Sequence, residues 1–114
     1  MPFSIDNLTA TDNPLKRLQK PNQYTTTLTF ALTAPTDKTI KIEYSLSDSN
    51  SIHFIVNGKK VKSFETTWDK KKAVSQKIVL EAPAGSVRST VFVKATDTSN
   101  QNTRTEDTRV NFPN

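Results

Sequence analysis

Residues 24–32 are Tyr-Thr-Thr-Thr-Leu-Thr-Phe-Ala-Leu, and large apolar side chains alternate with threonine or alanine over most of this stretch. Residues 40–46, Ile-Lys-Ile-Glu-Tyr-Ser-Leu, show the same alternation with lysine, glutamate and serine between. A β-strand directs successive side chains to opposite faces, so each segment has one apolar and one polar face. We therefore predict two strands joined through residues 34–38 as an antiparallel hairpin, with the rest of the chain covering its apolar side.

The length and composition of the chain favour a single all-β domain spanning residues 1–114. A chain of 114 residues is long enough for one two-layer core. The apolar content of 33% is low, but the clean alternation argues against disorder. Threonine, which suits the solvent face of a strand, occurs seventeen times. No cysteine is present, so a disulfide or a thiolate metal site is excluded.

The sequence also bears on where the protein acts. No apolar run approaches the roughly 20 residues that a membrane-spanning helix needs, so we expect no membrane span. Residues 1–6 have neither the basic region nor the apolar core of a signal peptide. Either the protein stays where it is made, or it is a module of a longer exported chain. We expect the second, at the extracellular cell surface, with a virion component as the alternative.

The clearest turn in the chain is Asn57-Gly58, which follows an apolar segment at residues 52–56. A type I′ turn needs positive φ at both central positions, and asparagine and glycine adopt it most readily. A two-residue turn at this point places Lys59 opposite Val56. Phe64 then breaks the alternation, so we expect the chain to bulge or to change sheet there.

The remaining segments complete the predicted sheet pattern. A first strand at residues 3–10 shifts phase near Asp6-Asn7, which indicates a bulge, and residues 15–20 form either one helical turn or a plain loop. Further strands are expected at residues 74–80, 87–95 and 103–112. The total of seven or eight short strands is typical of an immunoglobulin-like antiparallel β-sandwich. A barrel is the alternative, although two glycines are few for its coiled corners.

Two stretches carry a resemblance to known modules. Residues 28–47, LTFALTAPTDKTIKIEYSLS, resemble the start of Calx-beta modules, and residues 78–97, IVLEAPAGSVRSTVFVKATD, resemble the E–F corner of Calx-beta, bacterial immunoglobulin-like and fibronectin type III domains. The order of features is similar to that of immunoglobulin-like domains in bacterial surface and phage structural proteins. The resemblance implies a sandwich and a role as a module. The calcium-binding acidic cluster of Calx-beta is absent, and so are the cysteine pair and core tryptophan of antibody domains.

The residues needed for catalysis are sparse. His53 is the only histidine, and a zinc site needs several nitrogen or sulfur ligands. Serine–histidine–aspartate chemistry depends on His53 too, but no Gly-x-Ser-x-Gly elbow exists. Calcium bound by Asp97, Asn100, Asn102 and Asp12 is a further alternative, although turns hold such residues for backbone reasons. We expect no enzyme activity, no cofactor and no metal.

Trp68 is a candidate binding residue with two alternatives. If its ring is exposed, it can stack on a sugar ring, with Tyr24 or Tyr44 as a second platform. If its ring is buried, it caps one end of the sandwich core, which is the commoner role for a single tryptophan. Its polar neighbours, Thr66, Thr67 and residues 69–72, favour a partly wet position.

Residues 59–77, hereafter the basic region, carry the whole net charge of +5, because seven lysines face only Glu65 and Asp69. Such a field attracts polyanions such as acidic glycans or lipid headgroups. Aromatic residues within the region are few, so nucleic acid is not an expected partner. Lysines also protect edge strands from aggregation, which we favour here. The lysines are Lys59, Lys60, Lys62, Lys70, Lys71, Lys72 and Lys77.

These observations predict a non-catalytic immunoglobulin-like module of a bacterial surface or phage structural protein. It would act as a spacer or as an adhesion domain, presenting end loops or edge strands to a protein, a glycan or a neighbouring tandem domain. The alternatives are a carbohydrate-binding module using Trp68 and a polyanion-binding module using the basic region. The candidate ligand-binding residues are Trp68, Lys70, Lys71, Lys72, Lys60 and Lys62.

Overall fold

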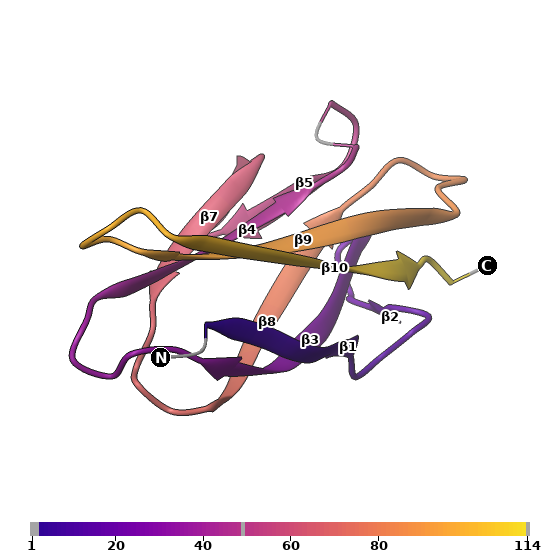
Figure 1. The fold of residues 1–114 in the computed structure, drawn as a ribbon. Coiled ribbons are helices and arrows are strands. Elements are labelled where there is room, and N and C mark those ends of the chain that lie inside the picture. Colours follow the sequence, from indigo (N-terminus) through magenta and orange to yellow (C-terminus); the bar gives the residue numbers. More distant parts are fainter. Residues whose placement is uncertain (1–2, 49, 114) are drawn as a thin grey trace.

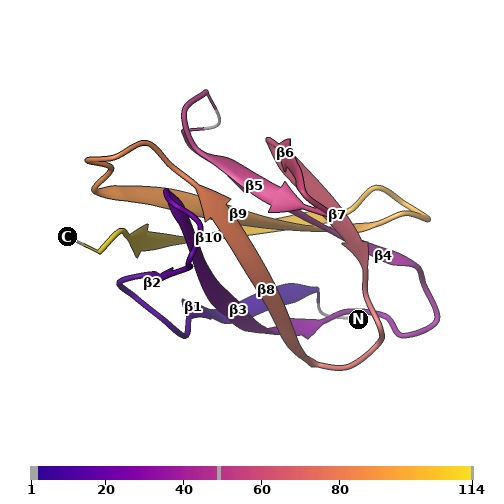
Figure 2. The same ribbon diagram turned by 180° about the vertical axis from the view of Figure 1, so that it is seen from behind.

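The computed structural model describes residues 3–48 and 50–113, which form ten β-strands in two antiparallel sheets. The first sheet has the order β1-β3-β8-β5-β6, with β2 paired beside β3, and the second has the order β10-β9-β4-β7. Figures 1 and 2 show the two layers from opposite sides. The all-β sandwich predicted from the alternation is therefore confirmed, although the described residues form ten strands and not the seven or eight expected.

The bounds of the strands follow the alternating segments closely. In the first sheet they are β1 (Ser4–Ala10), β2 (Lys16–Arg17), β3 (Gln23–Thr33), β5 (His53–Val56), β6 (Lys59–Val61) and β8 (Ala73–Glu81). In the second sheet they are β4 (Ile40–Leu46), β7 (Ser63–Thr67), β9 (Arg88–Asp97) and β10 (Thr103–Asn111). No described residue is helical.

The predicted hairpin between residues 24–32 and 40–46 is wrong, although both segments are strands. β3 pairs with β1 and β8, whereas β4 pairs with β7 and β9. The connection at residues 34–39 therefore crosses from one sheet to the other. Alternation does not distinguish a hairpin within one sheet from a crossing between two sheets. In both arrangements each strand buries one of its faces. Six residues easily span the roughly 10 Å between stacked sheets.

The strand order explains the immunoglobulin-like character of the fold. The neighbours β1-β3-β8 and β10-β9-β4 reproduce the A-B-E and G-F-C sets of an immunoglobulin sandwich. The segment between β4 and β8 departs from that plan. In this chain the β5–β6 hairpin joins the first sheet before β7 reaches the edge of the second.

The Asn57-Gly58 turn is confirmed in detail. Asn57 and Gly58 have φ values of 53° and 79°, as a type I′ turn requires. Lys59 lies opposite Val56 in the β5–β6 ladder. Of the two alternatives expected at Phe64, a bulge or a change of sheet, the second is present, since β6 belongs to the first sheet and β7 pairs with β4 in the second.

The N-terminal segments combine one confirmed and one corrected prediction. The β1–β3 register shifts between Asp6 and Thr9, and Asn7 adopts a φ of 59°, so the bulge is present. Residues 15–20 contain no helical turn, and the plain-loop alternative is only partly right, because residues 16–17 form the two-residue strand β2, which pairs with β3. Leu15 is buried while Leu18 is exposed, so these two side chains do not share an inward face.

The predicted strand at residues 87–95 begins one residue too early. β9 starts at Arg88, and Val87 lies in the preceding turn with 65% of its surface exposed. Its backbone carbonyl still accepts a hydrogen bond from Phe112, at 2.8 Å. The apolar character of Val87 therefore does not reflect burial.

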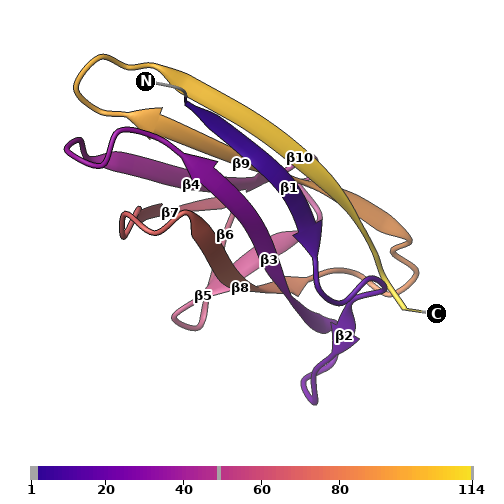
Figure 3. The ribbon, with the colours of Figure 1, turned by 60° about the horizontal axis from the view of Figure 1, so that its bottom comes forward.

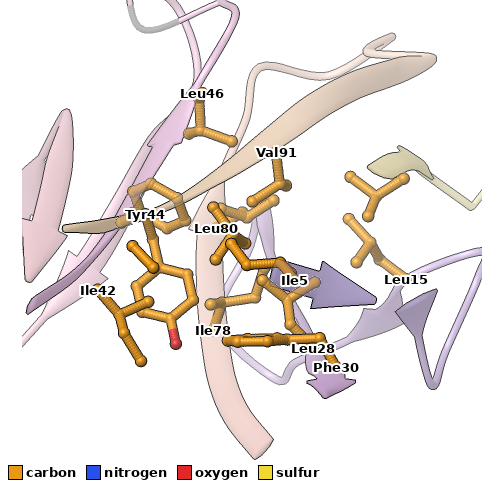
Figure 4. Close-up of a cluster of buried hydrophobic side chains, with 14 of the residues drawn as sticks. Ile5, Leu15, Leu28, Phe30, Ile42, Tyr44, Leu46, Ile78, Leu80 and Val91 are labelled. Atoms are coloured by element: carbon orange, nitrogen blue, oxygen red, sulfur yellow. The ribbon is translucent and has the colours of Figure 1, made fainter. Parts of the chain in front are cut away.

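The core lies between the two sheets and is built from the inward side chains that the alternation identified (Figure 4). One side of the sandwich is closed where β1 lies against β10, although these strands belong to different sheets (Figure 3). Fully buried side chains come from both layers. They include Leu28, Ile40, Ile42, Tyr44, Phe54, Ile78, Leu80, Val91, Val93 and Val110.

Tyr44 is unusual within this core because its hydroxyl has no hydrogen-bond partner among the described residues. Its ring stacks on Phe64 with 4.8 Å between centroids. Thr66 lies near the hydroxyl but outside hydrogen-bond geometry. Burial raises the pKa of Tyr44 to about 12, and the neighbouring Thr66 opposes this shift only weakly.

Tyr44→Phe is therefore expected to leave the free energy of unfolding at pH 7 unchanged or higher by up to about 1 kcal/mol, since an unsatisfied buried hydroxyl costs more than an apolar replacement. The raised pKa favours the folded state below pH 10, and that contribution is lost as the pH rises towards 12. Urea titrations of both proteins across this window should show the free energy of unfolding of the variant rising relative to that of the native chain, because the two proteins differ only in this hydroxyl. A variant that is less stable at pH 7 by more than about 1 kcal/mol would show that the hydroxyl has a partner.

Candidate functional site

Trp68 lies at one end of the core, directly after β7, and is 4% exposed. Its backbone N–H donates to the Ile40 carbonyl at 2.9 Å. Its indole Nε1–H donates to the Lys71 carbonyl at 2.7 Å. Of the two alternatives, the buried core position is therefore confirmed, and the exposed sugar platform is wrong. Tyr24 and Tyr44, the proposed second platforms, are buried as well.

The loop that follows Trp68 is fixed by hydrogen bonds to its backbone groups. Asp69 Oδ1 accepts a hydrogen bond from the Lys71 N–H at 3.0 Å, and the Lys72 carbonyl accepts one from the Leu32 N–H at 2.8 Å. Lys70 adopts a φ of 75°, places its ammonium 5.8 Å from the centre of the Trp68 ring and donates to the Lys38 carbonyl. The Lys71 and Lys72 side chains remain exposed.

The other lysines of the basic region are distributed over several elements. Lys60 forms an ion pair with Glu81, at 2.9 Å between Nζ and Oε1. The hydrogen bond from Lys60, supported by one from Gln23, lowers the pKa of Glu81. Lys62 occupies the corner between β6 and β7, and Lys77 is exposed on β8. The six candidate residues therefore do not form one site, because Trp68 is buried and Lys60 and Lys70 already have partners.

His53 lies beside a carboxylate but lacks the contacts of a catalytic histidine. It is opposite Glu81 in the β5–β8 ladder, and both line a shallow hollow together with Ser51. No hydrogen bond joins His53 to Ser51 or Glu81, and the Glu81 oxygens are occupied by Lys60 and Gln23. The hollow therefore lacks the relay from nucleophile to base that acyl transfer requires.

The Asp97 side chain is engaged in the turn between β9 and β10. Its Oδ1 accepts hydrogen bonds from the Ser99 hydroxyl at 2.7 Å and the Ser99 N–H at 2.9 Å. Asp12 is held elsewhere, where its N–H donates to the Thr26 hydroxyl at 2.9 Å. Within residues 3–48 and 50–113, no three His, Cys, Asp or Glu side chains gather as a metal site would require.

Asp97→Ala is expected to destabilise the fold at neutral pH, with a loss that shrinks in acid. The hydrogen bonds from the Ser99 hydroxyl and N–H lower the pKa of Asp97 in the folded state. Its contribution is therefore complete above the usual aspartate pKa near 3.8 and is lost as the pH falls below it. Thermal melts of both proteins from pH 7 to pH 2.5 test this, and a melting difference that stays constant over the range would contradict it.

A groove that the sequence analysis missed opens between β5, β7 and β8. β5 pairs with β8 only at residues 53–54 and 80–81, and beyond that point the two strands part. The resulting cavity measures about 460 Å³. A second hollow of about 150 Å³ continues along β8 towards Trp68 and shares Thr66 and Gln76 with the first.

We call this feature the β8 groove and define it by the residues around it. The first cavity is lined by residues 54–57, 64–66 and 76–79, and the second adds Ile42, Tyr44, residues 67–69 and residues 73–75. One signal was present in the sequence, because Gln76 is a polar residue at an inward position of an otherwise apolar strand. Alternation alone does not show where a partner strand ends.

Comparisons with known proteins support the fold and nothing finer. No protein-family model and no curated protein sequence matches the chain. The crystal structure of a FixG-related protein from Vibrio parahaemolyticus aligns over 100% of this chain and 99% of that chain, with a TM-score of 0.61 and 16% sequence identity. The chain thus belongs structurally to the two-sheet antiparallel β-sandwiches. None of its described residues forms a helix long and apolar enough to cross a membrane.

Proposed function

We propose that this protein is a non-catalytic immunoglobulin-like module that serves as a spacer and interaction domain of a bacterial surface protein or a virion. The observation that carries the proposal is the shape of the sandwich. It measures 44 × 24 × 20 Å, and β1 begins at one end while β10 finishes at the other (Figure 1). A module of this form contributes its full length to a row of domains.

The two outer strands support the spacer role mechanically. β1 is paired with β3 and β10 with β9, and both run along the length of the molecule (Figure 3). The hydrogen bonds of an antiparallel ladder lie perpendicular to its strands. A force along the length therefore loads many ladder bonds at once, which favours resistance to extension.

The open side of the sandwich supports the interaction role. The β8 groove combines apolar side chains from both sheets with an incomplete strand ladder. An apolar cleft with a few polar groups is the usual form of a binding site. The sugar-binding alternative has no such support, because the Trp68 ring is buried.

A polyanion-binding role for the basic region is a second candidate, favoured by the exposed side chains of Lys71 and Lys72. Retention on a heparin column tests it. Changing Lys70, Lys71 and Lys72 to alanine should lower the salt concentration needed for elution. Unchanged elution would exclude this loop as the binding surface.

Single-molecule extension tests the spacer role. In tandem repeats pulled through the chain ends, we expect a higher rupture force than in the same domain pulled through Arg88→Cys and Asn111→Cys. These two residues lie directly opposite each other at one end of the β9–β10 ladder, so force applied there breaks its bonds one at a time. The chain has no cysteine of its own, so the attachment is unique. Equal forces in the two directions would contradict the spacer role.

The proposed location has its own test. An antiserum raised against the domain should label intact cells or purified virions of the source organism. Labelling confined to the cell interior, with none on surfaces or particles, would refute the location while leaving the mechanical result intact.

A further inference from the structure

We propose that the β8 groove binds a short, extended, acidic peptide, which adds to the open edge of β8 as a further strand. The proposal rests on the interaction role and names the partner for it. An extended chain gains affinity from main-chain hydrogen bonds to a sheet edge and specificity from alternate side chains that enter pockets. The structure offers both components along β8.

The first component is the open edge itself. β8 pairs with β3 along all nine of its residues, but its other side pairs with β5 only at Leu80 and Glu81. The Thr25 hydroxyl of β3 donates to the Ile78 carbonyl at 2.8 Å, so the backbone groups of Ile78 face β3. Alternation then turns those of Lys77 and Val79 to the open side. In the described part of the chain, no strand covers them.

At the Lys77 carbonyl, a side-chain donor takes the place of the N–H group that a partner strand would supply. It accepts a hydrogen bond from the side-chain Nε2 of Gln76 at 2.9 Å. Gln76 lines both cavities of the β8 groove. An incoming N–H group can replace this side-chain donor, and the freed amide then lies in the groove as a polar group for the peptide.

The second component is the groove beside the edge. Its larger cavity is bounded by Phe54 and Phe64, which meet edge to face with 5.0 Å between ring centroids, and by Ile78. Alternate side chains of an added strand point to this side of the sheet. The smaller cavity reaches Tyr44, whose buried hydroxyl lacks a partner.

Charge selects an acidic peptide over other occupants. The basic region supplies β6, β7 and much of β8, and it has a charge of +5. Of its charged residues, Lys77 and Glu65 line the larger cavity of the groove and Asp69 lines the smaller one. The two carboxylates of the region are partly occupied, since Glu65 lies 3.9 Å from Lys41 and Asp69 binds the Lys71 N–H. A second copy of this chain is a poor partner, because edge-to-edge pairing would set one basic region against another. The lysines that protect the edge from self-pairing thus attract an acidic strand.

Amide-resolved NMR with synthetic heptapeptides tests the proposal. The acidic probe is Glu-Val-Thr-Val-Asp-Val-Glu, and its controls are the same peptide with proline at the central valine and a version with lysine at each acidic position. We expect the acidic probe to shift the signals of residues 54–57 and 74–79 and to slow amide exchange at Lys77 and Val79. Both control peptides should bind at least tenfold more weakly.

Matched variants separate the edge from the charge. Val79→Pro removes a donor that faces the open side while leaving the β3 ladder intact, and Val79→Thr is its control. Lys77→Glu should weaken binding of the acidic probe at least fivefold, whereas Lys94→Glu, exposed on β9 in the other sheet, should not change it. If Val79→Pro fails to fold, the lysine variants and the control peptides decide the question.

Several results would overturn the proposal. These are an absence of shifts at millimolar peptide, shifts confined to residues 70–72, equal binding of the lysine peptide, or a concentration-dependent dimer formed through β8. None of them bears on the rupture forces. If the domain resists end-to-end extension but does not bind the acidic probe, the spacer role stands and the peptide-binding proposal is rejected.

Discussion

Trp68→Ala is expected to lower the free energy of unfolding by about 3–5 kcal/mol, because removing a buried aromatic side chain leaves a cavity. The ring is 4% exposed, and its indole N–H holds the Lys71 carbonyl at 2.7 Å. A stable domain has about 5–15 kcal/mol in total, so the loss is a large fraction of it. Urea titration followed by far-ultraviolet circular dichroism measures it, since the variant lacks tryptophan fluorescence.

Two controls separate core packing from other effects of the substitution. Trp68→Phe keeps most of the apolar volume and should lose less, chiefly through the unsatisfied Lys71 carbonyl. Val87→Ala, at a side chain that is 65% exposed, should stay within about 0.5 kcal/mol of the native protein. A Trp68→Ala protein as stable as the native one would place the ring on the surface and restore the sugar-binding alternative.

Phe54→Ala has a comparable expected cost of about 3–5 kcal/mol. Phe54 is fully buried on β5 and meets Phe64 of β7 edge to face, so this aromatic pair joins the two sheets beside the β8 groove. Such a pair contributes about 0.5–1.5 kcal/mol beyond its buried area. Trp68 fluorescence during urea unfolding reports the change.

Phe54→Leu is the matched control, and it should lose no more than about 1.5 kcal/mol because it keeps most of the volume. A loss of less than about 1 kcal/mol for Phe54→Ala would mean that β5 is not packed across the core at this point. In that case the larger cavity of the β8 groove would lack one of its walls.

Much of the fold follows from local sequence. The alternation in residues 24–32 and 40–46 identifies β3 and β4, because a buried face requires it. Asn57-Gly58 defines both the turn and the register of β5 and β6, since few other residue pairs adopt two positive φ values. The break in parity at Phe64 correctly indicates a bulge or a change of sheet, but it does not decide between them.

Strand pairing does not follow from local sequence. The same alternation fits a β3–β4 hairpin and a crossing between sheets, and the choice depends on contacts between distant segments such as β4 with β9. Residues 16–17 lack any alternating pattern, yet β3 recruits them as a partner. Chain length and pattern therefore predict a sandwich but not its strand order.

The candidate site was the part least accessible from the sequence. Burial of Trp68 depends on the loop that folds beneath it, where the Lys71 carbonyl accepts from the indole. The lysines of the basic region look contiguous in sequence, but the sheet change at Phe64 distributes them over several elements. The β8 groove exists because β5 pairs with β8 at only two positions and then diverges from it. No local pattern in the sequence predicts where this pairing ends.

The central claim is that β3 and β4 lie in different sheets. Nuclear Overhauser contacts between backbone protons of opposing strands test it most directly. We expect such contacts between Ile42 and Ala95 and between Thr26 and Ile78, and none linking the backbones of β3 and β4. A continuous ladder of contacts between residues 24–32 and 40–46 would contradict the sandwich described above.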